Sequence, residues 1–184
     1  MLEIITKEHP ILRGISSAVA VADILKPETQ KIIENMRIAV QSQDDGVALA
    51  APQIGISLRM FVIAPRVFEE TPSEQLDERS DPALPLRKSK NEHFVYINPE
   101  ITKLSKRRAW VDEGCLSVRW LYGKVSRASK ASVRAYDENG KQFERGASGL
   151  LAQIFQHEID HLNGILFIDN ARDIVDIPPQ KANQ

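Results

Sequence analysis

Two segments of the chain place apolar residues at the spacing of an α-helix. The first covers residues 26–46, and a proline suits its opening turn. Its apolar face consists of Ile32, Ile33, Met36 and Val40. The second runs from about Ser148 to Leu162, and its broad apolar face contains Leu150, Leu151, Ile154, Phe155 and Leu162. We therefore expect one helix near the N-terminus and one near the C-terminus.

Shorter apolar runs between these segments predict β-strands. Residues 59–65 and 93–101 are rich in β-branched and aromatic residues, and we expect each strand to stop at its proline. Residues 109–143 predict further strands, and Asn139-Gly140 within them is a strong hairpin signal. The pattern thus predicts an α+β fold, with antiparallel strands packed around a C-terminal helix and a second helix near the N-terminus.

The remaining segments suggest one domain with a long loop and a tail. Residues 66–92 are charged, carry three prolines and lack apolar periodicity, so we expect a surface loop there that is mobile or serves a partner. With 184 residues the chain has the length of a single domain. We assign that domain to residues 1–170 and a polar C-terminal tail to residues 171–184.

Composition and charge exclude several classes of protein. The net charge is −1, so no strong field would gather nucleic acid or an anionic membrane. The N-terminal apolar residues are too few and too interrupted for a signal peptide or a membrane span, which makes the cytoplasm the expected location. The single cysteine, Cys115, cannot form an internal disulfide.

The C-terminal helical segment carries a candidate metal site. It contains His-Glu-x-x-His, and His157, Glu158 and His161 fall within its apolar face. Burying these groups is unfavourable unless each finds a partner, and a metal ion would supply one. Asp160 falls on the opposite face, together with Gln153 and Gln156, and we expect it to be a solvated charge without a chemical role.

Two histidines do not hold a catalytic metal, so a third ligand is needed. The chain has no His and no Glu after His161, where metalloproteases with this helix usually find one. Upstream, Cys115 offers a thiolate suited to Zn²⁺ or Fe²⁺, and Gly114 beside it allows close approach of the backbone. One Cys and two His would leave a fourth position for water, as in catalytic sites.

Three other functions fit parts of this pattern. A zinc endopeptidase would use the same helix but lacks its downstream ligand here. A cysteine hydrolase would use Cys115 as nucleophile and would be indifferent to chelators. A non-catalytic module would use the metal only to join helix and sheet, with His9, His93 or a carboxylate closing the site.

Three motifs together resemble those of the peptide deformylase family. The family pattern Gly-x-Gly-x-Ala-Ala-Pro-Gln corresponds to residues 46–53, Glu-Gly-Cys-Leu-Ser to residues 113–117, and Gln-His-Glu-x-Asp-His-Leu to residues 156–162. The resemblance extends from about Ile4 to Asp169. It implies a metal-dependent hydrolase that removes the formyl group from the N-terminal formyl-methionine of newly made polypeptides and releases formate.

The resemblance also implies the cofactor and its ligands. Cys115, His157 and His161 would hold one divalent metal ion, usually Fe²⁺ in cells and replaceable by Zn²⁺, Ni²⁺ or Co²⁺. The metal would lower the pKa of a water molecule, and Glu158 would take the proton of that water as it attacks the formyl carbon. The substrates would be nascent chains met at the ribosome, with a transient ribosome contact.

Further positions carry over from the family in the same way. Gln53, through its side-chain amide, and Leu116, through its backbone N–H, would stabilise the charge that builds on the carbonyl oxygen. The peptide would lie extended along a strand near Gly46, Val47 and Ala48. Leu150 and Ile154, which precede His157 on the helix, would form the wall of an apolar pocket for the methionine side chain, or would simply pack in the core.

Two departures from the family pattern bear on rate and specificity. Ala48 stands where the family has its second glycine, and its β-carbon could narrow the cleft, reduce activity or change the substrate preference. After Ser117 the family often has proline, whereas this chain continues with Val118-Arg119-Trp120-Leu121-Tyr122. Arg119, Trp120 and Tyr122 would line the rim of the site, cover the core or meet solvent.

Overall fold

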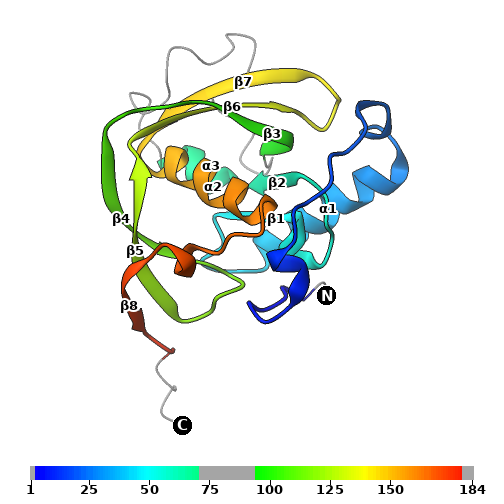
Figure 1. Ribbon diagram of the computed structural model, residues 1–184. Coiled ribbons are helices and arrows are strands. Elements are labelled where there is room, and N and C mark those ends of the chain that lie inside the picture. Colours follow the sequence, from blue (N-terminus) through cyan, green and yellow to red (C-terminus); the bar gives the residue numbers. More distant parts are fainter. Residues whose placement is uncertain (1–2, 71–93, 180–184) are drawn as a thin grey trace.

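The computed structural model describes residues 3–70 and 94–179, whose strands form two antiparallel sheets (Figure 1). The larger sheet has the order β1-β2-β3-β6-β7 and the smaller β4-β5-β8. The strands are β1 (Ala48–Ala50), β2 (Met60–Ile63), β3 (Phe94–Leu104), β4 (Arg108–Gly114), β5 (Leu121–Ala128), β6 (Lys130–Tyr136), β7 (Gln142–Ser148) and β8 (Arg172–Asp176). The helices are α1 (Pro27–Gln41), α2 (Pro65–Glu70) and α3 (Gly149–Leu162). None of the helices in the described part is long and apolar enough to cross a membrane.

Helix α3 lies between the two sheets and contacts strands of both (Figure 1). Its apolar side packs on the larger sheet, where Phe61 and Tyr96 stack with ring centroids 4.6 Å apart and Phe155 of α3 meets Tyr96 at 5.3 Å. The predicted arrangement, antiparallel strands around the C-terminal helix, is therefore confirmed.

The larger sheet is buried on both faces because alternate residues of its strands point to opposite helices. Phe61 and Ile63 of β2 pack toward α3, whereas Met60 and Val62 pack toward α1. Helix α1 begins at Pro27, as its pattern predicted, and presents Ile33 and other apolar residues to this second core. Both faces of the strand next to β1 are thus fixed by packing.

Strand β3 runs further than its sequence predicted. We expected it to end at Pro99, but it continues to Leu104 and pairs with β6. The register shifts between Ile97 and Glu100, and Asn98 has a φ of 51° there. This irregularity accommodates the proline, which cannot donate to a regular ladder.

Two segments expected to lack regular structure contain short elements. The start of the predicted 66–92 loop belongs to α2, where Val67 and Phe68 are buried, so that part of the loop prediction is wrong. The predicted tail contains β8, which pairs with β5. The rest of the loop from residue 71 and the tail from residue 180 lie outside the described residues.

Gln156 joins α3 to the smaller sheet through its side-chain amide. Its Oε1 accepts from the backbone N–H of Ala128 at 2.9 Å, and its Nε2 donates to the carbonyl of Ala128 at 3.0 Å. The sequence placed Gln156 on the polar side of the helix, but the residue is buried because this second sheet covers that side. The amide takes the place of a neighbouring strand for β5.

We expect Gln156→Leu to lower the free energy of unfolding by about 2–3 kcal/mol. The substitution leaves the N–H and C=O of Ala128 buried without these partners, which costs more than the loss of an exposed hydrogen bond. Urea unfolding with matched metal content measures the change. Gln142→Leu, at an exposed position of β7, is the control, and an equal loss in both variants would contradict the prediction.

Candidate metal centre

Three potential metal ligands lie together at one end of the space between the sheets. His157 and His161 are one turn apart on α3, and Cys115 follows the last residue of β4. One ligand atom from each residue lies within 4.8 Å of the others, and Cys115 Sγ is 3.2 Å from His161 Nε2. The structure thus brings together the three residues that the sequence predicted as ligands.

A chain of charged side chains orients His157 from behind. Its Nδ1 is 3.0 Å from Glu113 Oε2, so its Nε2 remains for a ligand. Arg127 donates to both carboxylate oxygens of Glu113, at 2.7 and 2.9 Å, and to Asp160 Oδ2 at 2.5 Å. Hydrogen bonds from His157 and Arg127 outweigh the effect of burial and lower the pKa of Glu113 to about 2. A charged Glu113 therefore holds the His157 ring in place.

The sequence did not reveal these supporting residues. Asp160 was expected to be a solvated charge, and that expectation is wrong, because its carboxylate binds Arg127 beside the centre. Arg127 comes from β5 and is distant in sequence from every ligand. Glu113 stands within the Cys115 motif, but nothing in its spacing indicated contact with His157. Only the fold brings the three together.

The cluster favours the ionised form of its thiol. Burial alone would raise the pKa of Cys115, but the charges and hydrogen bonds of His161 and His157 lower it to about 5. A thiolate with two imidazoles is a donor set that suits Zn²⁺ or Fe²⁺ and leaves coordination positions open. The residues present therefore fit a divalent metal ion.

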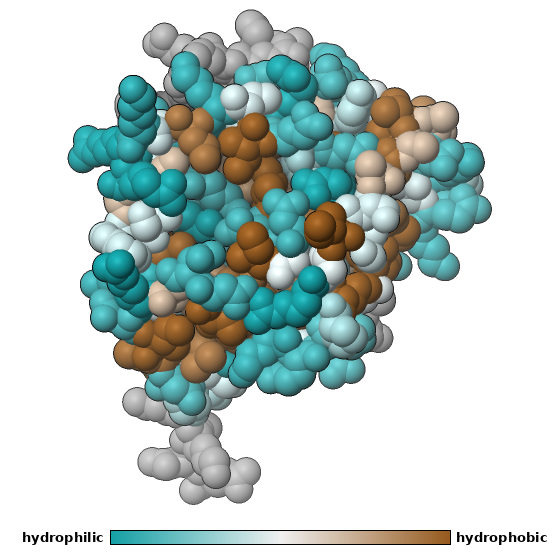
Figure 2. Space-filling model, viewed as in Figure 1, coloured by the Kyte–Doolittle hydropathy of each residue, from teal (hydrophilic) through white to brown (hydrophobic). Residues whose placement is uncertain are grey.

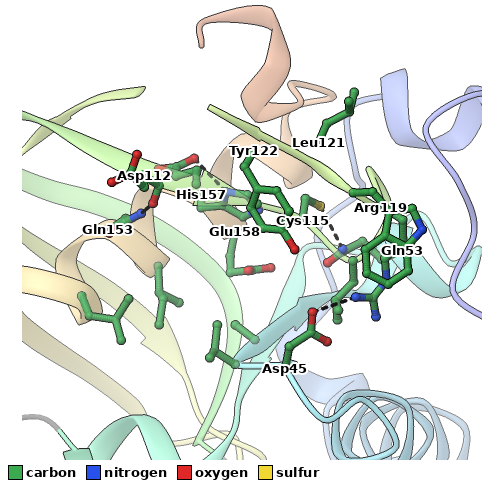
Figure 3. Close-up of a pocket in the computed structure, with 18 residues that line it drawn as sticks. Asp45, Gln53, Asp112, Cys115, Arg119, Leu121, Tyr122, Gln153, His157 and Glu158 are labelled. Atoms are coloured by element: carbon green, nitrogen blue, oxygen red, sulfur yellow. Dashed lines mark hydrogen bonds and ion pairs between the residues drawn. The ribbon is translucent and has the colours of Figure 1, made fainter. Parts of the chain in front are cut away.

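Glu158 faces the same space but is not one of the clustered ligands (Figure 3). Burial raises the pKa of its carboxyl to about 7, and the negative charges of Cys115 and Glu113 act in the same direction. Its Oε2 is buried and has no hydrogen-bond partner in the described part of the chain. A carboxyl that titrates near neutral pH beside a metal site can accept and return a proton.

Gln53 points its amide nitrogen toward the centre. Its Oε1 accepts from the backbone N–H of Ala50 at 2.8 Å, which turns Nε2 toward Cys115 Sγ at 3.5 Å and Ser117 Oγ at 3.2 Å (Figure 3). The side chain is buried. A neutral donor is thus fixed beside the potential metal ligands. Leu116, which follows Cys115, lines the same space.

A pocket of about 320 Å³ opens onto the centre and is lined by most of the residues that the sequence singled out. Figure 3 shows Cys115, His157, Glu158 and Tyr122 facing it. Its remaining walls include Val47, Ala48, Asp112, Arg119, Trp120, Leu150, Gln153 and Ile154. Arg119, Trp120 and Tyr122 therefore belong to the pocket. Gly46 is not among the lining residues and packs against the backbone of Val40.

The surface of the molecule mixes polar and apolar side chains on the face seen in Figure 2, without one continuous apolar area. Trp120 and Leu150, which line the pocket, are among the large apolar side chains that remain partly exposed. Apolar groups at the mouth of a pocket are available to a ligand.

Strand β1 presents an edge to this pocket. Within the described residues β1 pairs with β2 alone, and the carbonyl of Val47 accepts from Ala64 N–H next to β2. Because backbone groups alternate along a strand, those of Ala48 point to the opposite edge. The N–H of Ala50 also points there and is taken by Gln53. An extended chain in the pocket can pair with this edge.

Comparison with known proteins gives a single family. The family model described as polypeptide deformylase matches residues 1–176. The peptide deformylase of Halothermothrix orenii is 41% identical over 160 residues, which are 87% of this chain and 86% of that protein. The peptide deformylase of Mesorhizobium japonicum is 38% identical over 161 residues, 88% and 78% of the two chains.

A solved structure agrees with this result. The crystal structure of a peptide deformylase from Legionella pneumophila superposes with a TM-score of 0.75 at 36% identity, covering 94% of this chain and 87% of that one. These comparisons do not favour a zinc endopeptidase. The three-ligand cluster, the buried Glu158 and the edge of β1 agree with the result, and the chain belongs to the peptide deformylase family of enzymes, which remove the N-formyl group from nascent peptides.

Proposed function

We propose that Cys115, His157 and His161 hold one divalent metal ion, Fe²⁺ in cells, with Zn²⁺, Ni²⁺ or Co²⁺ as substitutes. The donor set supports this proposal, because one thiolate and two imidazoles suit these metals better than Mg²⁺ or Ca²⁺. When bound, the ion supplies a positive centre that polarises the formyl carbonyl and acidifies water.

Glu158 is the general base and then the general acid of the reaction. Its carboxylate takes a proton from the attacking water and returns one to the amine as the C–N bond breaks, so that formate and a free N-terminus leave. The observation that carries the assignment is this buried carboxyl, whose pKa of about 7 suits both transfers near neutral pH.

Gln53 and Leu116 stabilise the negative charge on the former carbonyl oxygen. The Gln53 nitrogen is supported by the fixed orientation of its amide, and the backbone N–H of Leu116 is supported by its place next to Cys115. Both donors are neutral, so they bind the developing charge without holding the formate product as a cation would.

The substrate is a formyl-methionine peptide that lies along the edge of β1, near Gly46, Val47 and Ala48. Leu150 and Ile154 form the wall that receives the methionine side chain. Leu150 lines the pocket yet is 41% exposed, which is expected of an apolar wall that awaits a ligand. The setting is the nascent chain in the cytoplasm, with a transient contact to the ribosome.

Glu158→Ala tests the base. We expect the variant to fold and to bind metal in the wild-type ratio, while formate release from a formyl-Met peptide falls by about 10²–10⁴-fold. Metal analysis and a formate assay on anaerobically prepared protein measure both quantities. Release at the wild-type rate, or release from metal-free protein, would contradict the mechanism. The second result would favour Cys115 as a nucleophile.

Glu113→Gln tests the support of the metal ligand. The substitution keeps the size of the side chain but removes the charge that orients His157, so metal affinity should fall by about 10–100-fold. Competition with a chelator measures the affinity. Glu144→Gln, which removes an exposed carboxylate paired with Arg134, is the matched control and should bind as the wild type does. Equal affinities in the three proteins would refute the proposed role.

Gln53→Glu tests the oxyanion donor. The glutamate keeps an oxygen for the N–H of Ala50 but replaces the NH₂ donor by a negatively charged oxygen. We expect kcat to fall by about 10²–10³-fold with a small change in KM, because the lost interaction exists mainly in the transition state. A raised KM with an unchanged kcat would instead place Gln53 in ground-state binding.

A further inference from the structure

An ion pair joins the two sides of the pocket mouth. Arg119 Nη1 donates to Asp45 Oδ2 at 2.7 Å, and Arg119 Nη2 donates to Gln43 Oε1 at 2.6 Å (Figure 3). Arg119 comes from the segment after Cys115, whereas Gln43 and Asp45 come from the segment between α1 and β1.

Both segments that carry the pair are anchored. Arg66 of α2 donates to the backbone carbonyls of Gln43, at 3.1 Å, and of Gly46. On the other side, the carbonyl of Trp120 accepts from the N–H of Ile177 at 2.8 Å, and the Arg119 guanidinium lies 5.4 Å from the centre of the Trp120 ring. The pair is therefore a defined part of the pocket.

The pair lies where the residues after the methionine would pass. This step rests on the proposed function. The formyl group must meet the metal ligands next to Gln53, which comes after the C-terminal end of β1. A peptide on the edge of β1 must then extend toward its N-terminal end, past Val47 to Asp45. The second and third substrate residues thus come near the ion pair.

The charges at this point differ for basic and acidic side chains. Among the described residues that line the pocket, Arg119 is the one Lys or Arg, whereas Asp45 and Asp112 are both acidic. Arg119 is already bound to Asp45 and is the less exposed of the two, with 28% of its side chain accessible against 58%. A basic side chain can reach Asp45 without breaking the pair, but an acidic one must compete with Asp45 for Arg119.

We propose that the Arg119–Asp45 pair is a specificity element that favours a basic over an acidic residue directly after the formyl-methionine or one position further. Methionine recognition and the chemistry belong to other residues. The pair acts on the charge of the second or third substrate side chain.

The test compares kcat/KM for amidated peptides formyl-Met-Lys-Ala and formyl-Met-Glu-Ala, and for formyl-Met-Ala-Lys and formyl-Met-Ala-Glu, at low ionic strength. We expect the wild-type enzyme to prefer lysine by about twofold to fivefold in at least one pair, the range of a solvent-exposed charge interaction. Arg119→Gln leaves Asp45 without its cation and should raise the ratio. Asp45→Asn leaves Arg119 without its carboxylate and should bring the ratio below one.

Opposite shifts in these two variants separate charge recognition from loss of structure, since a loosened segment would affect all peptides in the same direction. Glu144→Gln, on β7 and not among the pocket residues, is the control and should keep the wild-type ratio. Ratios that stay at one, or that move together in both variants, would overturn the inference while formate release from formyl-Met-Ala-Ala continued. No release from that neutral peptide would instead overturn the proposed function.

Discussion

The burial of a thiolate, two imidazoles and a carboxyl in one pocket is the constraint on which the rest of the structure depends. Each of these groups loses hydration on folding, so each requires a partner within reach. The structure meets that demand from behind with Arg127, which binds Glu113 and thereby fixes His157. In front, the three donor atoms converge on one point that a cation would occupy. The same network joins β4, β5 and α3, so the centre and the fold hold each other in place.

The position of α3 between two sheets connects this constraint to substrate binding. One side of the helix packs on the larger sheet through Phe155, and the other side is held to the smaller sheet by the amide of Gln156. The helix therefore presents His157 and Glu158 to the space beside β1, which is an edge of the larger sheet within the described residues. An edge strand next to a metal centre suits a peptide, because backbone pairing can align the end of a chain without reading its side chains.

The sequence predicted the parts of this structure that depend on periodicity and on local chemistry. The two main helices, most strands and the Asn139-Gly140 hairpin come from spacing and turn residues, and the metal ligands come from chemical type. The features that the sequence did not predict depend on contacts between distant segments. Asp160 and Gln156 were placed on a polar helix face, and only the packing of β5 against that face explains their contacts. Short elements such as β8 form because a neighbouring strand exists, not because their own pattern is strong.

The alanine in place of the second glycine of the first motif shows the same dependence on context. From the sequence alone, the β-carbon of Ala48 threatened to narrow the cleft. In the structure its side chain belongs to the apolar core that includes α3. Side chains of a strand stand perpendicular to the sheet, whereas N–H and C=O groups lie within its plane. The methyl group of Ala48 and the edge that would pair with a peptide therefore point in different directions. The alanine adds to the packing under the site and leaves the pairing edge open.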